Sequence, residues 1–148
     1  FTPQINSFRG EDSVQLNILD IRPSCAAPCS AEMGSYTALR AGSLTPEGAS
    51  QLLPDRATLA LVWRYLANCG CQTVRESPMC LCRKIVRWSG TALNLGQLLT
   101  CLDIFSDVGL LQTQRLHKYL TIQLTPRAEK ADLGASATMQ VLLHLKES

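Results

Sequence analysis

The sequence lacks any apolar run near the roughly 18 residues that a membrane-spanning helix needs, so we expect no such helix. It contains no Gly-x-Gly-x-x-Gly and no Gly-x-x-x-x-Gly-Lys motif, which argues against dinucleotide and P-loop nucleotide binding. Strong charge is also missing, because the formal net charge of +2 is too small to indicate nucleic-acid binding by itself. With 46% hydrophobic and 18% charged residues, the chain is expected to be globular rather than disordered.

A catalytic constellation is missing as well. The two histidines, His117 and His144, stand alone in the sequence. The carboxylates are scattered, except that Asp103 and Asp107 lie one helical turn apart, and such a pair is usually a solvated helix face. We therefore expect that this chain alone is not an enzyme.

Cysteine is abundant, since the chain has seven, an odd number, without an apparent secretion signal. This pattern favours a reduced, cytoplasmic protein. Thiolates in such number could bind zinc, but the spacing differs from the usual Cys-x-x-Cys knuckle and buried thiols are common. Packing thiols without a cofactor are therefore the favoured interpretation, and a zinc site is the alternative, for the pairs Cys25 and Cys29, Cys69 and Cys71, and Cys80 and Cys82.

Local patterns predict an N-terminal strand. Residues 13–21 alternate between apolar and polar side chains, as a half-buried strand does, and Pro23 ends the pattern. The chain begins at Phe1 rather than Met, so we expect a piece of a longer protein that starts inside a sheet. An unpaired strand invites association, so we expect residues 13–21 to pair with the following linker, the C-terminal domain or a second copy of the chain.

The rest of the chain is predicted to be mostly helical. Residues 24–44 resemble a linker with a short strand near Tyr36 to Arg40. A strand is expected over residues 116–124, paired with Leu110 and Leu111 across a turn at residues 112–115. N-cap residues and closing Gly or Pro residues predict five helices: between Thr45 and Pro54, Asp55 and Gly70, Ser77 and Gly90, Asn94 and Gly109, and after Ser136.

The order helix, helix, short turn, helix, β-hairpin is typical of a winged helix. We therefore expect an α+β fold with three parts: a hairpin or strand at residues 1–24, a linker with a short helix at 25–54, and a winged-helix-like domain at 55–148. The first 54 residues carry a net charge of −2 and the remainder +4, which favours a polyanionic partner for the second part.

A DNA-reading role for the helix over residues 94–108 is disfavoured by its charge. Its expected outer face holds Gln97, Thr100, Asp103 and Asp107 and no Lys or Arg, although phosphate contacts dominate DNA affinity. The basic residues lie elsewhere and could form a strip along a nucleic-acid backbone, or simply a solvated face: Arg83, Lys84, Arg87, Arg115 and Lys118, followed by Arg127 and Lys130.

Several segments resemble the RecJ family of bacterial single-strand-specific exonucleases, which are DHH phosphoesterases. The stretch "FRGEDSVQLNILDIRPS" is similar to the end of the oligonucleotide-binding (OB) fold of that family, in which an Asn-x-Phe-x-Gly turn leads into a "VQLxxxDIRPS" strand. Three further segments resemble the extra C-terminal region of the Firmicute-type members: "LLPDRATLALVWRYL", "LLTCLDIFSDVGLL" and "KADLGASATMQVLLHL".

This resemblance implies a parent enzyme that degrades single-stranded DNA from its 5′ end with Mn or Mg ions, in recombination and repair. The metal-binding motifs of the family are absent from this chain, so no catalytic or metal-binding residue is carried over. The chain would be the last strands of an OB barrel plus an accessory domain, in which the turn residues Asn6, Phe8 and Arg9 could meet single-stranded DNA. Asn6 and Gly10 could equally serve only to form the turn.

Three roles remain open for this region. It could hold single-stranded DNA, it could dock a partner such as the acidic tail of single-strand binding protein, or it could be a structural cap on the barrel. A free-standing winged-helix regulator is the alternative outside the family.

Overall fold

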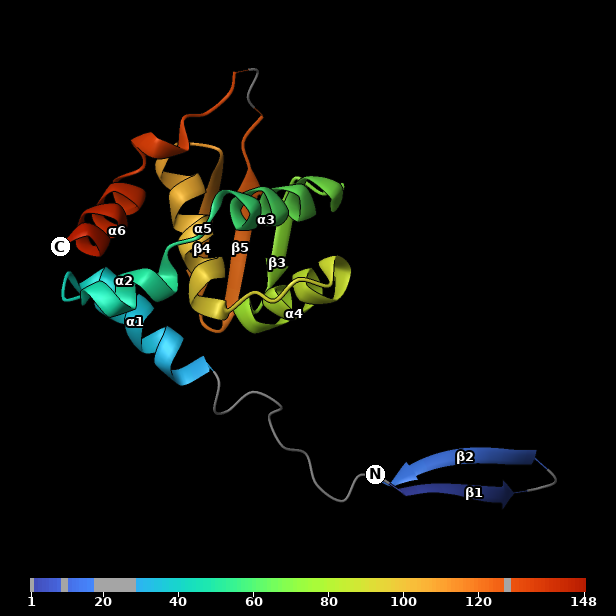
Figure 1. Cartoon of the computed structure of the whole chain (residues 1–148). Helices are drawn as coiled ribbons and strands as arrows, with labels where there is room; N and C mark the ends of the chain where they lie inside the picture. The colour runs from blue at the N-terminus through green and yellow to red at the C-terminus, as the bar shows by residue number, and fades with distance from the viewer. Residues whose placement is uncertain (1, 9–10, 18–28, 127–128) are drawn as a thin grey trace.

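The structure, a computed structural model, describes residues 2–8, 11–17, 29–126 and 129–148 (Figure 1). Its N-terminal part is an antiparallel hairpin of β1 (Thr2–Phe8) and β2 (Glu11–Asn17), whose register runs from Thr2 opposite Asn17 to Phe8 opposite Glu11. The predicted strand is confirmed over residues 13–17, whereas residues 18–21 lie outside the described residues. Its partner in the described residues is the segment immediately upstream, and not the predicted linker or C-terminal domain.

Helices make up most of the chain from residue 29 onward. All five predicted helices have the predicted cap. The side chains of Thr45, Asp55, Ser77 and Asn94 each accept a hydrogen bond from the backbone N–H three residues later. Ser136 caps the fifth in the same way. The helices are α1 (Cys29–Ala41), α2 (Pro46–Leu52), α3 (Arg56–Asn68), α4 (Pro78–Ser89), α5 (Leu95–Asp107) and α6 (Ala137–Glu147), with a short 3₁₀ helix, η1 (Leu133–Ala135), before α6.

A three-stranded antiparallel sheet accompanies these helices. It consists of β3 (Thr73–Glu76), β4 (Leu111–Leu116) and β5 (Tyr119–Leu124) in the order β3-β5-β4. The sequence analysis missed β3. It also misplaced the hairpin turn, because residues 112–115 belong to β4 and the chain reverses at His117 and Lys118, where His117 adopts a positive φ of 56°.

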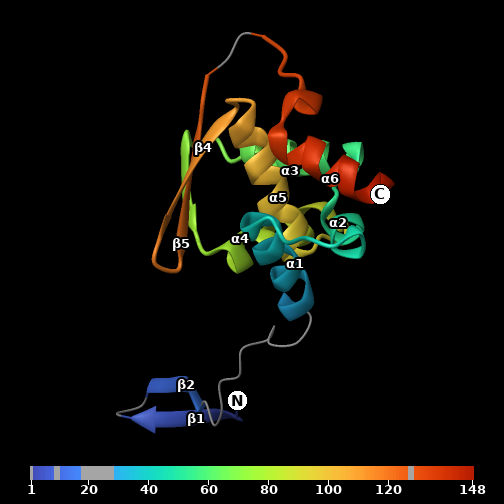
Figure 2. The same ribbon diagram turned by 90° about the vertical axis from the view of Figure 1, so that its left-hand side faces the viewer.

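The helices lie on one face of this sheet and leave the other face uncovered (Figure 2). Alternation along the strands explains this asymmetry. Leu111, Leu120 and Ile122 are buried on the covered face, while the residues between them on β4 and β5 are mostly exposed. The sheet is therefore a half-buried layer with one solvent-facing surface.

Helix α5 is the centre of the core. It packs against α1, α2, α3, α4, α6 and β4. The predicted apolar stripe of this helix is confirmed, since Leu95, Leu98, Leu102 and Phe105 are all buried. A helix that is apolar on several sides needs neighbours on several sides, and that requirement places α5 inside the molecule.

The expected linker is part of the same core. Residues 36–40, predicted as a short strand, lie inside α1, and the Tyr36 side chain is buried against α5. Helix α2 buries Ala49 and Leu52, and packs against α6. The described part of residues 25–54 is therefore not a linker, because both of its helices share the core of residues 55–148.

The observed architecture is α+β, as predicted. None of the helices in the described ranges combines the length and the apolarity that crossing a lipid bilayer requires.

Candidate functional site

Helix α4 presents three of the predicted basic residues to solvent. Leu81, Cys82 and Ile85 are buried on one face of the helix. Helical periodicity then places Arg83, Lys84 and Arg87 on the exposed side, as predicted. The α4 basic face, as we call these three residues, begins about two turns after β3 ends at Glu76, beyond the Ser77 N-cap.

Lys84 of this face is tied to the sheet. Its ammonium group forms a hydrogen-bonded ion pair with the Glu76 carboxylate of β3, and this contact raises the pKa of Lys84. The pair joins the middle of α4 to the edge strand β3. Part of the positive charge of the α4 basic face is therefore balanced within the molecule.

The other two residues of the predicted basic strip lie on different surfaces of the molecule. Lys118 lies in the β4–β5 turn, at the same end of the molecule as α4 in both views (Figures 1 and 2). Arg115 instead lies opposite Leu120 on the helix-covered face of the sheet, and its guanidinium carbon is 5.7 Å from the centroid of the Tyr36 ring. The predicted strip of five residues is thus divided, with Arg115 on a different surface.

Two further predicted residues belong to the N-terminal hairpin. Asn6 lies within β1, opposite Ser13 of β2, and Phe8 also lies in β1, so neither occupies the turn as predicted. Arg9 and Gly10 lie outside the described residues, as do Arg127 and the side chains of Cys25 and Cys29.

The predicted polar outer face of α5 is partly covered by protein. Thr100 is completely buried, and its hydroxyl donates a hydrogen bond of 2.8 Å to the Gly96 carbonyl. Gln97 and Asp103 are half-buried, and Asp103 faces α1. Asp107 is exposed and contacts the start of α6. The expectation of a solvated face therefore holds for Asp107 and is wrong for Thr100.

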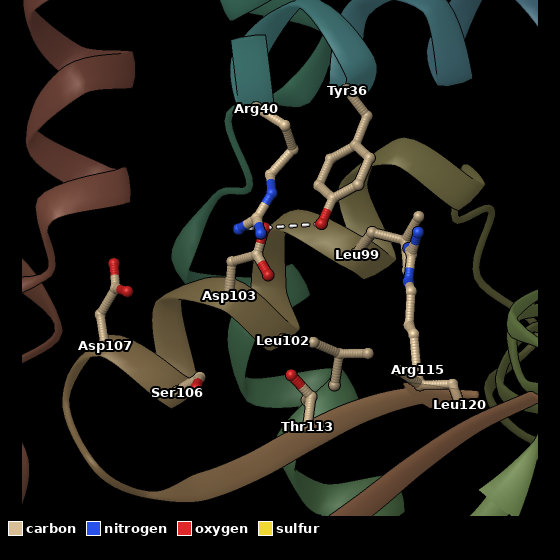
Figure 3. A pocket seen from close by; sticks show the side chains of 10 residues that line it. All are labelled: Tyr36, Arg40, Leu99, Leu102, Asp103, Ser106, Asp107, Thr113, Arg115 and Leu120. Atoms are coloured by element: carbon tan, nitrogen blue, oxygen red, sulfur yellow. Dashed lines mark hydrogen bonds and ion pairs between the residues drawn. The ribbon is translucent and has the colours of Figure 1, made fainter. Parts of the chain in front are cut away.

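A polar pocket of about 380 Å³ lies between α1, α5 and β4 (Figure 3). Its central contact is a hydrogen bond of 2.7 Å from the Tyr36 hydroxyl to Asp103 Oδ2. Arg40 Nη1 lies 3.9 Å from the same oxygen, and its side chain is 68% exposed. Figure 3 shows Arg40 and Arg115 on either side of the Tyr36 ring, so the Asp103 carboxylate is held by Arg40 and the Tyr36 hydroxyl, and Arg115 lies across the ring.

Burial shifts the pKa values of Asp103 and Tyr36. Desolvation raises the pKa of Asp103 despite the opposing hydrogen bond from Tyr36, and desolvation together with that hydrogen bond raises the pKa of Tyr36 far above its ordinary value. Burial also acts to raise the pKa of Asp107, but it is outweighed. Hydrogen bonds from the Thr138 N–H and the Ser136 hydroxyl hold the pKa of Asp107 below its usual range.

These contacts indicate an anchoring role for the pocket. Each of its two carboxylates is held by a donor from another helix, so the pair fastens α1 and α6 to α5. The lining contains no His, Cys or Lys side chain among the residues that the structure describes. The sequence analysis missed Tyr36 and Arg40 because it treated residues 24–44 as a linker, although Met33, Tyr36 and Arg40 have helical spacing.

A second, more apolar pocket of about 610 Å³ lies between α3, α5 and the segment that leads to η1. Trp63 and Phe105 meet there edge to face, with ring centroids 5.5 Å apart. The side chains of Arg56 and Lys130 stand at this pocket together with Glu129.

The cysteines and histidines do not converge on a site in the described ranges. Cys82 and Cys101 are buried, and burial raises the pKa of the Cys101 thiol far above its usual range. Cys69, Cys71 and Cys80 are exposed. Over residues 2–8, 11–17, 29–126 and 129–148, no three His, Cys, Asp or Glu side chains gather in a way that could hold a metal ion.

Comparison with known proteins gives no relative for this chain, because no protein family, curated protein or solved structure matches it.

Proposed function

We propose that this chain is the non-catalytic C-terminal region of a RecJ-like 5′-to-3′ exonuclease and helps to hold single-stranded DNA during recombination and repair. The observation that carries the proposal is that helix α4, with its exposed basic face, and the β4–β5 turn, with the exposed Lys118, lie at the same end of the molecule (Figure 1). Cations grouped in this way attract a phosphate backbone without reading its sequence.

The topology supports a winged-helix description of residues 56–124. The order α3-β3-α4-α5-β4-β5, with a sheet ordered β3-β5-β4, is that of a helix-turn-helix followed by a β-hairpin wing. In DNA-reading members of this class the second helix of the motif enters the major groove. Here that helix is α5, and α1 and α6 pack against it, so a sequence-specific regulator is disfavoured.

The Mn or Mg ions of such an exonuclease do not fit the described part of this chain. No suitable set of carboxylates and imidazoles is present in those ranges, so the ions would belong to the nuclease domain of the parent protein. The role proposed for this chain is limited to binding and positioning the strand.

Fluorescence anisotropy tests this proposal. A labelled single-stranded oligonucleotide is titrated with the full chain at low and moderate salt, and binding is expected to weaken as salt rises. Reversing Arg83 and Arg87 to Glu should abolish binding, whereas Arg64→Glu, at an exposed position on α3, should have a small effect. Equal effects of both changes, or no binding at low salt, would refute the proposal.

The apolar pocket favours a second candidate, the docking of an acidic peptide with an apolar end. Such a peptide, for example the tail of single-strand binding protein, would place its apolar end against Trp63 and Phe105 and its acids near Arg56 and Lys130. A labelled acidic peptide should then bind the chain, and Trp63→Ala should weaken that binding without changing DNA affinity.

A further inference from the structure

The uncovered face of the three-stranded sheet carries a consistent set of side chains. Arg75 lies opposite Thr121, which in turn lies opposite Gln114, so these three residues form one row across the sheet. Gln112 and Gln123 form part of the next row. All of these residues are exposed except Thr121, which is half-buried, and no helix lies over them (Figure 2).

The side chains of this face are better suited to bind a polyanion with polar bases than to bind another protein. Glu76 is the only acid on the three strands, and its register opposite Leu120 places it on the helix-covered face, where it pairs with Lys84. Apart from Leu116, which lies opposite Tyr119 and is 55% exposed, the uncovered face therefore offers amides, hydroxyls and a guanidinium without a repelling carboxylate. The centre of a stable protein interface is typically more apolar than this.

Arg75 and Tyr119 form a platform at the turn end of the face. The Arg75 guanidinium carbon lies 5.4 Å from the centroid of the Tyr119 ring, which is within the range of a cation–π contact. Tyr119 remains 42% exposed although it is aromatic. Lys118, the residue before it, adds a second positive charge at the rim. Aromatic rings and guanidinium planes are the groups on which unstacked bases lie in single-strand binding proteins.

We propose that single-stranded nucleic acid crosses the uncovered sheet face, with one base stacked at Tyr119 and Arg75. Phosphates on either side meet Lys118 and the α4 basic face, and the glutamine amides of β4 and β5 contact the strand along its path. This inference rests on the proposed function and adds to it the surface that the strand occupies. The sequence alone did not reveal it, because β3 and the position of the hairpin turn were both missed.

The test uses anisotropy of a labelled oligothymidylate with the full chain and its single variants. Tyr119→Ala should weaken binding about tenfold, and Tyr119→Phe should restore it, since stacking needs the ring and not the hydroxyl. Arg75→Ala should also weaken binding, because it removes the guanidinium plane beside the stacked base. Lys118→Ala should instead reduce the slope of log affinity against log salt by about one, as expected for a lost phosphate contact. Arg64→Ala serves as the matched arginine control on α3.

The possible results separate this inference from the proposed function. Binding that is lost on reversing Arg83 and Arg87 but unchanged in Tyr119→Ala and Arg75→Ala would overturn the sheet path and leave the proposed function standing. No binding by the unmodified chain at low salt would overturn both. Urea unfolding of each variant checks the fold, and a Tyr119→Ala variant with unchanged stability and tenfold weaker binding would support the stacking role.

Discussion

The hydrogen bond between Tyr36 and Asp103 gives the sharpest test of how α1 is held. Tyr36→Phe keeps the buried ring and removes only the hydroxyl that lies 2.7 Å from Asp103 Oδ2. The Asp103 side chain is 16% exposed, and its other neighbour, Arg40, is 3.9 Å away and mostly in solvent. A hydrogen bond to a charged group contributes about 1.5–3 kcal/mol, and leaving its partner partly buried without a donor forfeits most of that amount. We expect Tyr36→Phe to lower the free energy of unfolding by about 2 kcal/mol at neutral pH.

Urea unfolding measured by circular dichroism gives this value. Tyr119→Phe is the matched control, because the Tyr119 side chain is 42% exposed, and it should change stability by less than about 0.5 kcal/mol. A Tyr36→Phe variant as stable as the control would show that the hydroxyl does not anchor α1. A double-mutant cycle with Asp103→Asn then isolates the coupling between the two side chains.

The pH dependence provides a second check on the same contact. Burial raises the pKa of Asp103 above its unfolded value of about 4. A carboxyl shifted in this direction stabilises the fold fully below its unfolded pKa, and the contribution is lost as the pH rises through its folded pKa. The bond from Tyr36 acts to lower the pKa of Asp103, so Tyr36→Phe should raise that pKa further. The stability gap between the two proteins should therefore narrow at acid pH, and carboxyl NMR titration should show the upward shift directly.

Four further predictions follow from other contacts. Gly90→Ala should cost about 1–2 kcal/mol in urea unfolding because Gly90 has a φ of 67°. Gly34→Ala, in an open position of α1, should instead stabilise by up to about 1 kcal/mol, and two changes of equal sign would contradict this reasoning. The pKa of Asp107 lies below its usual range, so its contribution to the free energy of unfolding is present above pH about 4 and is lost as the pH falls through the folded pKa. Asp107→Asn should therefore flatten the acid side of the profile of stability against pH. A thiol reagent followed by peptide mass spectrometry should label Cys101 only after unfolding, and rapid labelling of the native chain would contradict its burial. Leu142→Ala should cost about 2–5 kcal/mol, since Leu142 is the fully buried side chain of α6, and a loss below 1 kcal/mol would show that α6 packs loosely.

The helix boundaries could be predicted because they depend on local chemistry. Each N-cap is a contact between a side chain and a backbone N–H three residues away, as in Asn94 to Gln97 at 2.6 Å. A closing glycine such as Gly90 acts through its own backbone conformation. Neither signal depends on the rest of the fold, so a single sequence contains enough information to place them.

The errors arose where distant residues decide the structure. Helix α1 carries few large apolar side chains, and its Tyr36 hydroxyl donates a hydrogen bond to Asp103 on another helix. The polar residues of α5 pointed to a solvated face, but Thr100 satisfies its hydroxyl within its own helix and can therefore be buried. The β4–β5 turn contains His117 in a left-handed conformation without the usual Gly or Asn signal, so the turn was predicted at the wrong residues.

In the candidate site, too, the features that depend on local sequence were predicted and those that depend on distant residues were not. Helical spacing was sufficient to place Arg83, Lys84 and Arg87 on an exposed side of α4. The position of Arg115 depends on the register of β4, which cannot be known when the turn is misplaced. The contact between Arg75 and Tyr119 needs two strands that are far apart in the sequence, and one of them had not been predicted.

The packing of α1 and α2 has a practical consequence for anyone dividing this protein into fragments. A polypeptide starting at residue 55, where sequence patterns suggest that a domain begins, would lack the side chains of Tyr36, Ala49 and Leu52 and would expose the apolar surfaces they cover on α5 and α6. Exposed surface of that kind promotes aggregation during expression. A polypeptide starting at residue 29 retains both helices, so the smallest independently folding unit extends about two dozen residues further toward the N-terminus than the winged-helix pattern indicates.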